Sequence, residues 1–156
     1  MKAKELLLTG VLFIIFSSCG GQTQNDVPAN VKSAFTQKFS NATNVKWGRE
    51  NDQEWEAEFK MDSKSYAADF DNAGIWVETE YEINENEIPA IVKSTLDKES
   101  TGAKINLSEV AETADGISYE FIVGRGEDQT ELVIDNSGKL ISNELVNPED
   151  ENDSED

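Results

Sequence analysis

The sequence contains no histidine and only one cysteine, and these two scarcities exclude several kinds of site. Without histidine, the usual zinc ligand sets and the Ser/His and Cys/His nucleophile pairs cannot be assembled. A lone cysteine cannot form an internal disulfide. Carboxylate pairs, lysine and tyrosine remain for acid–base chemistry. We therefore expect a protein that is not an enzyme and that uses neither a cofactor nor a metal ion.

Basic residues are also scarce. The 156-residue chain has 13 Lys and Arg against 32 Asp and Glu, which gives a formal charge of −19. Such a surface repels nucleic-acid phosphates and anionic lipid head groups, and it favours cationic partners or cations. The aromatic residues recur at regular, strand-like positions, which indicates a folded core with acidic ends instead of a disordered chain. The length suits one compact domain or two small fused ones.

The N-terminal segment has the organisation of an export signal. A basic start and an apolar run over residues 6–16 are followed by small residues and then Cys19. The run is shorter than the ~20 residues that a membrane-spanning helix needs. We predict a lipoprotein signal peptide over residues 1–18, lipidation at Cys19, and a lipid anchor with a flexible tether over residues 19–26.

The surroundings of Cys19 resemble a lipobox. Two glycines follow the cysteine, and Phe16 stands where many lipoboxes have leucine, a departure that resembles the usage of Bacteroidetes lipoproteins. The alternative is an ordinary signal peptide with an incidental cysteine. Several acyl chains at one site would give stable anchoring. The expected location is therefore the cell envelope, in the periplasm or at the outer membrane, with the membrane contacted through the anchor only.

The rest of the sequence is an internal repeat. Val27-Pro28 and Ile88-Pro89 each precede a stripe of apolar residues at helical spacing, and proline is favoured near the first helical position. The segments 71–74 and 135–138 match as Asp-Asn-Ala/Ser-Gly turns. We predict two copies, residues 27–83 and 88–146, each with one helix followed by a strand meander. The helical apolar residues are Val31, Ala34, Phe35 and Phe39 in the first copy, and Ile88, Ile91, Val92 and Leu96 in the second.

Strict alternation defines the faces of the first strands. Apolar residues alternate with charged ones over 54–61, so one sheet face is apolar and the other is wet. Trp47 lies two positions from Val45, and Trp55 four positions from Phe59, so each tryptophan should point to the same apolar face as its partner. We therefore assign Trp47 and Trp55 to the core. The predicted fold class is α+β, with two helices on one face of an antiparallel sheet of about eight strands. The alternating residues are Trp55, Ala57, Phe59 and Met61 against Glu54, Glu56, Glu58 and Lys60.

These motifs resemble those of a known family. A helix that begins Val-Pro, a strand with Val45-Lys46-Trp47 and the turn at 71–74, all within a duplicated pattern, are similar to the PepSY-like, β-lactamase-inhibitor-like envelope lipoproteins of Bacteroidetes. The resemblance covers residues 27–146. It implies the tandem helix-plus-four-strand fold of the β-lactamase inhibitor protein, and most members have no known role. The second copy departs from the pattern, because it has no tryptophan equivalent to Trp47. Residues 105–107 (Ile-Asn-Leu) occupy the corresponding strand.

The wet face of the first copy is the candidate binding site. If Val77, Thr79, Tyr81 and Ile83 face the helices, then Trp76, Glu78, Glu80 and Glu82 face outward beside Glu54, Glu56 and Glu58. An exposed tryptophan in an acidic ladder is typical of a hot spot for a basic partner. The alternative is that a loop partly covers Trp76 and that the glutamates are solvated residues that prevent sheet stacking.

Two other acidic patterns have simpler explanations. Asp69, Asp71, Gly74 and Glu80 fall on positions 1, 3, 6 and 12 of a calcium-loop pattern, but Ala73 occupies a ligand position and the flanks are strand-like. We interpret that segment as a turn. The C-terminal residues 147–156 carry an acidic run that is typical of a disordered, solvated tail.

Two functional hypotheses follow. The first is a non-enzymatic, lipid-anchored envelope protein that binds a protein or peptide through an open sheet face. Inhibition of a peptidase or hydrolase is then implied by the family resemblance alone. The second is an acidic protein that responds to cations or sequesters cationic peptides. Salt should separate them, because binding driven only by charge weakens steeply as ionic strength rises.

Overall fold

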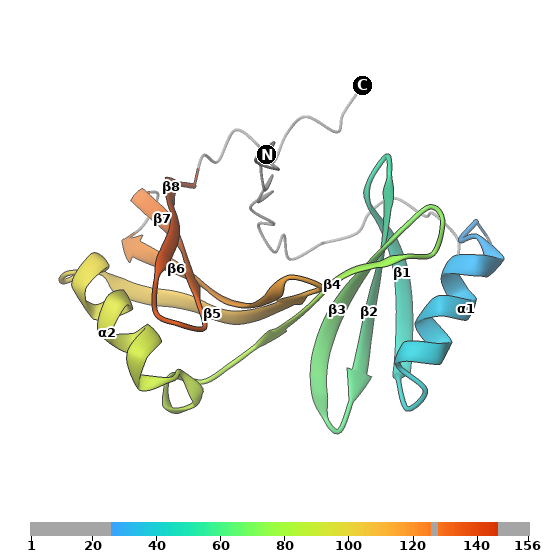
Figure 1. Ribbon diagram of the computed structural model, residues 1–156, viewed down its shortest axis with the longest axis horizontal. Helices are drawn as coiled ribbons and strands as arrows, with labels where there is room; N and C mark the ends of the chain where they lie inside the picture. The colour runs from blue at the N-terminus through green and yellow to red at the C-terminus, as the bar shows by residue number, and fades with distance from the viewer. Residues whose placement is uncertain (1–25, 126–127, 147–156) are drawn as a thin grey trace, which may run out of the picture.

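The computed structural model describes residues 26–125 and 128–146, which form two helix-plus-meander units in tandem (Figure 1). The first unit consists of α1 (Ala29–Lys38), β1 (Thr43–Asn51), β2 (Glu54–Met61), β3 (Lys64–Asp71) and β4 (Trp76–Glu82). The second unit begins with the short helix η1 (Glu85–Glu87) and continues with α2 (Ala90–Glu99), β5 (Lys104–Thr113), β6 (Gly116–Arg125), β7 (Asp128–Asp135) and β8 (Leu140–Leu145).

All eight strands form one antiparallel sheet in the order β1 to β8. Both helices cover the same face of it. Tyr81 pairs with Val110, Val110 with Tyr119 and Tyr119 with Ile134, so one face of the first unit continues as one face of the second. The sheet bends between the two units, and α1 and α2 lie on its outer side (Figure 1). The predicted α+β tandem repeat with two helices on one face is confirmed.

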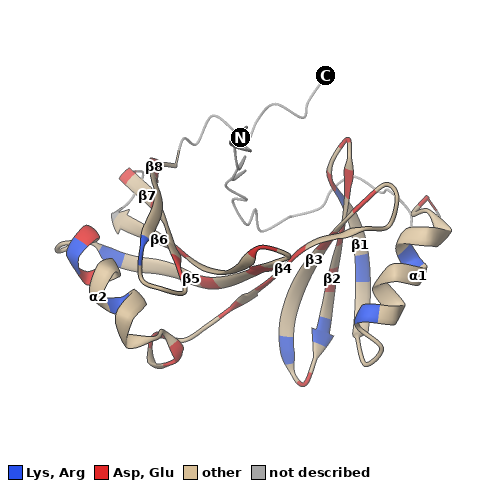
Figure 2. Cartoon of the chain, viewed as in Figure 1, with Lys and Arg blue, Asp and Glu red and all other residues tan. Residues whose placement is uncertain are grey.

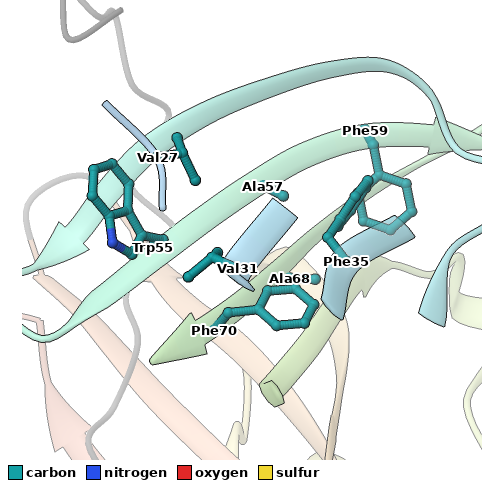
Figure 3. Close-up of a cluster of buried hydrophobic side chains, with 8 residues drawn as sticks. All are labelled: Val27, Val31, Phe35, Trp55, Ala57, Phe59, Ala68 and Phe70. Carbon is teal, nitrogen blue, oxygen red and sulfur yellow. The ribbon is translucent and has the colours of Figure 1, made fainter. Parts of the chain in front are cut away.

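The first core lies between α1 and strands β1 to β4. Phe35 from the helix packs edge-on against Phe59 and Phe70 (Figure 3), with ring centroids 5.1 and 6.1 Å apart. It packs in the same way against Trp47, at 5.2 Å. Trp55 is buried in the same cluster, and its indole nitrogen donates a hydrogen bond to Asn72 Oδ1 at 3.0 Å. Burying the two tryptophans removes a large apolar area from water. The assignment of Trp47 and Trp55 to the core is confirmed.

The second core lies between α2 and strands β6 and β7. It is built from aliphatic side chains around Phe121, the one fully buried ring among the residues described for this cluster. Val92 and Leu96, one helical turn apart, face the sheet from α2. Ile105, on the strand that lacks a counterpart of Trp47, packs at the edge of this cluster. The buried members are Ile88, Val92, Leu96, Phe121, Val123, Leu132 and Ile134.

The two repeated Asp-Asn-X-Gly segments are turns, as predicted. Asp71 Oδ1 accepts hydrogen bonds from the backbone N–H groups of Ala73 and Ile75 at 2.9 and 2.8 Å. Gly74 has a φ of 82°, a conformation that costs glycine little. Its backbone lies against the first turn of α1, where an added Cβ would meet the carbonyl oxygen of Asn30 at 3.0 Å. The turn at Gly138 lies in the same way against Ile91, so each turn packs against the first turn of the helix in its own unit.

The predicted signal peptide, the lipidated Cys19, the tether and the acidic tail lie outside the described residues, apart from Asp26 at the end of the tether. Within residues 26–125 and 128–146, no helix has the length and apolarity needed to cross a membrane.

Candidate protein-binding face

The sheet face opposite the helices carries rows of carboxylates, and we call it the acidic face. The register places Glu56 beside Asp69 and Asp69 beside Glu78 in one row. Side chains of directly paired residues point to the same side of a sheet, so these carboxylates are immediate neighbours. Figure 2 shows Asp and Glu along the central strands β3 to β5. The carboxylates of the acidic face are Glu54, Glu56, Glu58, Asp69, Glu78, Glu80, Glu82, Glu109, Glu120, Glu131 and Glu144.

Asp69 lies at the centre of the first row and is 3% exposed. Its Oδ1 atom has no hydrogen-bond partner among the described residues. Burial, followed by the nearby charges of Glu50 and Glu56, raises the pKa of Asp69 from its ordinary value of 3.8 to about 9. A buried carboxyl group without a partner is costly to ionise, because the charged form loses its hydration. At neutral pH this site favours a proton or a neighbouring cation.

Glu80 on β4 and Glu109 on the adjacent strand β5 are two further buried carboxylates of the acidic face. They are 3% and 4% exposed, and Glu109 Oε1 has no hydrogen-bond partner among the described residues. Burial, with Glu78 as the largest of several like charges, raises the pKa of Glu80 to about 10. Burial and the charge of Glu82 raise the pKa of Glu109 to about 7. The charge of Glu109 also contributes to the raised pKa of Glu80.

Three half-buried glutamates surround these buried groups. The pKa values of Glu56 and Glu78 rise to about 7, and that of Glu120 rises to about 8. Burial is the largest cause in each case, and neighbouring carboxylates add to it. A shift of this kind over a whole face is typical of functional surfaces, although networks that only support structure also produce it.

Few cations compensate this charge. Among the described ion pairs, the one on the acidic face joins Lys46 Nζ to Glu58 Oε2 at 3.7 Å. Arg49 lies instead over the ring of Trp55, 4.0 Å from its centroid. No group of three or more Asp, Glu or Cys side chains in the described residues converges closely enough to hold a metal ion. The acidic face therefore suits cationic groups that are supplied from outside the domain.

The prediction that Trp76 shares this face is wrong. Trp76 pairs with Phe70, which belongs to the first core, and its ring packs against that core. The ammonium group of Lys38 lies over the indole, 3.5 Å from the ring centroid, and Trp76 Nε1 donates a hydrogen bond to Thr79 Oγ1 at 2.9 Å. Trp76 is a half-buried residue on the helix side.

A β-bulge explains the error. Asp69 pairs with Glu78 and Phe70 with Trp76, so Val77 is an extra residue in β4. Such an insertion interrupts the strict alternation of side chains. Residues after the bulge keep the predicted parity, so Glu78 and Glu80 lie on the acidic face with Glu56 and Glu58. The expected outward direction of Glu80 is correct, but its expected solvation is not, because the carboxylate is buried.

The sequence analysis did not identify four carboxylates of the acidic face, Glu109, Glu120, Glu131 and Glu144. It also missed Glu50, whose charge raises the pKa of Asp69. The repeat itself contained the signal for Glu120. The offset of 64 that relates the turn at 71–74 to that at 135–138 also relates Glu56 to Glu120, and both lie on the acidic face. Asp69 had been considered only as a calcium ligand. The turn interpretation of that pattern is confirmed, since Asp71 accepts hydrogen bonds from the turn backbone.

Comparison with known proteins identifies the family. The family model described as "Putative beta-lactamase-inhibitor-like, PepSY-like" matches residues 22–66 and 53–142, which together span most of the chain. The chain belongs to this family. The two overlapping matches agree with the tandem helix-plus-meander units seen in the sheet.

Solved structures share the fold. A DUF2874 family protein from Bacteroides ovatus is 21% identical, with 81% of this chain and 90% of that chain covered and a TM-score of 0.73. A "BLIP-like protein" from Bacteroides fragilis is 21% identical, with 76% and 86% covered and a TM-score of 0.68. A protein from Bacteroides eggerthii described as a "putative periplasmic" protein is 15% identical, with 77% and 89% covered and a TM-score of 0.71.

At these identities the likeness establishes the fold and not the activity. No curated protein matches the chain. The function must therefore be argued from the chemistry of the acidic face.

Proposed function

We propose that this protein is a non-enzymatic envelope protein that binds a basic protein or peptide through the acidic face. The observation that carries the proposal is the set of buried, uncompensated carboxylates on the face that no helix covers. Asp69, Glu80 and Glu109 are each less than 5% exposed, and no described ion pair neutralises any of them. The raised pKa values of Asp69 and Glu80 favour their protonated forms at neutral pH, and a basic partner would favour the ionised forms and take the place of the proton.

The shape of the sheet supports the same proposal. Both helices lie on the outer side of the bend, so the acidic face lies on the inner side (Figure 1). A curved sheet surface can contact a convex partner over a large area, and stable protein interfaces bury about 800 Å² per partner. The glutamates would provide charge complementarity, which steers association and selects the partner.

The location and role follow from the family and from the N-terminal sequence. We propose export by the segment 1–18 and lipidation at Cys19, which would place the domain in the periplasm or at the outer membrane. The description of one structural neighbour as periplasmic supports this location. The name of the family and of the Bacteroides fragilis neighbour supports inhibition of an envelope peptidase or hydrolase as the role.

The test is a pull-down from envelope extract with a soluble bait of residues 20–156, which contains every described element. The variant E56Q/E78Q removes two carboxylates from the acidic face, whereas D115N/D128N removes two exposed ones elsewhere. A partner captured by wild type and D115N/D128N but not by E56Q/E78Q is the expected result. Equal capture by all three baits would contradict the proposal.

A second candidate is an acidic protein that responds to cations or sequesters cationic peptides, and the rows of adjacent carboxylates on the acidic face favour it. Inorganic cations or cationic peptides would then bind the acidic face by charge alone, without a packed interface. The salt dependence of capture decides between the two candidates. An interface with packed contacts persists at high ionic strength, whereas binding by exposed charge alone is screened. Loss of all capture in moderate salt would favour the second candidate.

A further inference from the structure

A fork in the sheet opens between the two units. The pairing of β3 with β4 ends at Ala67 and Glu80, although β3 begins at Lys64 and β4 continues to Glu82. Residues 64–66 therefore have no strand partner on the β4 side. The sheet separates at this point into the β2–β3 hairpin and the β4–β5 pair, which is visible in Figure 1 as the gap beside the lower end of β3.

A cavity of about 940 Å³ occupies this fork. Its lining differs on the two sides of the sheet. Carboxylates line it from the acidic face, and the rings of Tyr66 and Tyr81, whose centroids are 5.2 Å apart, line it from the helix side. The carboxylate-bearing residues of the lining are Glu58, Glu80, Glu82 and Glu109.

Glu109 is the group within this cavity that most needs a partner. It is 4% exposed, and its Oε1 accepts no hydrogen bond from any described residue. The lining contains three lysines. Lys46 pairs with Glu58 at 3.7 Å and Lys64 with Glu87 at 2.9 Å, and Lys60 forms no described ion pair with Glu109. Burial raises the pKa of Glu109 to about 7, so a cation that entered would also favour its ionised form.

We propose that the fork cavity receives a lysine or arginine side chain of the partner, with Glu80 and Glu109 as its counter-charges. The proposal rests on the proposed function, because it assigns the anchor residue of that interface. The alkyl stem of such a side chain would lie along the tyrosine rings, as long basic side chains commonly do. The rings also attract cations: Lys64 Nζ already lies 5.7 Å from the centroid of Tyr81.

A basic side chain fits this cavity better than a bare metal ion does. The described carboxylates do not converge into a metal-binding group, and the cavity is far larger than one ion needs. Part of its wall is apolar and aromatic, which suits a stem with a charged end and not a hydrated ion.

The probe is the blocked pentapeptide acetyl-Gly-Val-Lys-Val-Gly-amide, titrated into labelled protein of residues 20–156 and followed by amide chemical shifts. We expect shifts around the fork and an affinity at least about tenfold weaker for E80Q/E109Q. D115N/D128N, which also replaces two acidic side chains by amides but at exposed positions away from the fork, should bind within about twofold of wild type. A peptide with norleucine in place of lysine should not bind.

Four results would overturn the proposal. They are binding of the norleucine peptide, equal weakening in D115N/D128N, shifts confined to residues away from the fork, and displacement of the peptide by millimolar calcium acting at the same amides. If E80Q/E109Q does not fold, the difference in binding between the lysine and norleucine peptides on the wild-type protein still tests the proposal. If E56Q/E78Q loses partner capture but the lysine peptide leaves the fork unperturbed, the cavity assignment fails and the proposed function stands. If every bait also captures equally, both fail.

Discussion

The first unit packs its helix with aromatic rings, whereas the second unit packs its helix with aliphatic side chains around Phe121. Phe35 contacts four rings of the first core at centroid distances of 5.1–6.1 Å. The helix of the second unit presents Val92 and Leu96 to its sheet. The same architecture is therefore reached with two different sets of side chains.

Corresponding positions in the two units share the same strand pairings and the same bulge. Phe70 pairs with Trp55 and Trp76, and Ile134 pairs with Tyr119 and Leu140. The bulge is kept as well, because one residue is extra between the pairs Val133–Ser142 and Ile134–Leu140, as it is in β4. Apolar spacing, turn and bulge specify this fold, and cores tolerate exchanges of side-chain identity when pattern and volume are preserved.

Truncation of the central core residues should give the largest effect. Phe70 and Ile134 are both fully buried. We expect Phe70→Ala to lower the free energy of unfolding by about 3–5 kcal/mol and Ile134→Ala by about 2–5 kcal/mol, from lost burial and the cavity left behind. Denaturant unfolding measures both, and Ile141→Ala, at an exposed position, is the control. A smaller loss for Phe70→Ala than for Ile134→Ala would contradict the importance of the aromatic core.

The two turn glycines should be the next most sensitive positions. Gly74 and Gly138 have φ values of 82° and 83°, and an added Cβ at Gly138 would lie 2.7 Å from Ile91 Cγ1. We expect Gly74→Ala and Gly138→Ala to cost about 1–3 kcal/mol each. The matched control is Gly102→Ala, whose φ is 73° but whose Cβ would meet nothing within 4 Å. If all three lose the same stability, the turns do not dock on the helices as described.

The buried carboxylate of Asp69 should make stability depend on pH. Its pKa is about 9 in the folded protein and near 3.8 when unfolded, so the folded state retains a proton that the unfolded chain releases between these values. Stability should therefore fall as pH rises from about 4 to about 9. Asp69→Asn should raise the melting temperature by about 5 °C at pH 8 and change it little at pH 4. Thermal melts across this range, with Asp115→Asn as control, check the prediction. An unchanged pH profile in Asp69→Asn would contradict it.

The contact between Lys38 and Trp76 should have the smallest effect. The ammonium group lies 3.5 Å from the ring centroid at the end of α1. Lys38→Met keeps the stem and removes the charge, and we expect it to cost about 0.5–1 kcal/mol. Lys98→Met, near the end of α2, is the control, since Lys98 pairs instead with Glu99. Equal losses in the two variants would assign the effect to the helix terminus and not to the indole.

Much of the fold could be predicted from the sequence because the pattern is local. Alternation over 54–61 gave the faces of β2, and the Asp-Asn-X-Gly segments gave two of the hairpin turns. The helical spacing of Val31 and Phe35, both buried, gave the face of α1 that contacts the sheet. The repeat extended these predictions to the second unit.

The features that could not be predicted depend on contacts between strands. The bulge at Val77 is a matter of register with β3, so the side of Trp76 could not be inferred from parity alone. The burial of Asp69 and Glu80 depends on the strands that pair on either side of them, which alternation along a single strand does not show. The fork cavity exists because β3 and β4 stop pairing at Ala67 and Glu80, and no local pattern marks that point.

Carboxyl footprinting of the captured complex is the most direct test of the central claim that the acidic face is the binding surface. A water-soluble carbodiimide with an amine labels accessible carboxyl groups, and mass spectrometry locates the labels. We expect the partner to protect Glu56, Glu58 and Glu78 while Glu85 and Asp97, on the helix side, remain labelled as in the free protein. Protection of Glu85 and Asp97 with unchanged labelling of the acidic face would contradict the account.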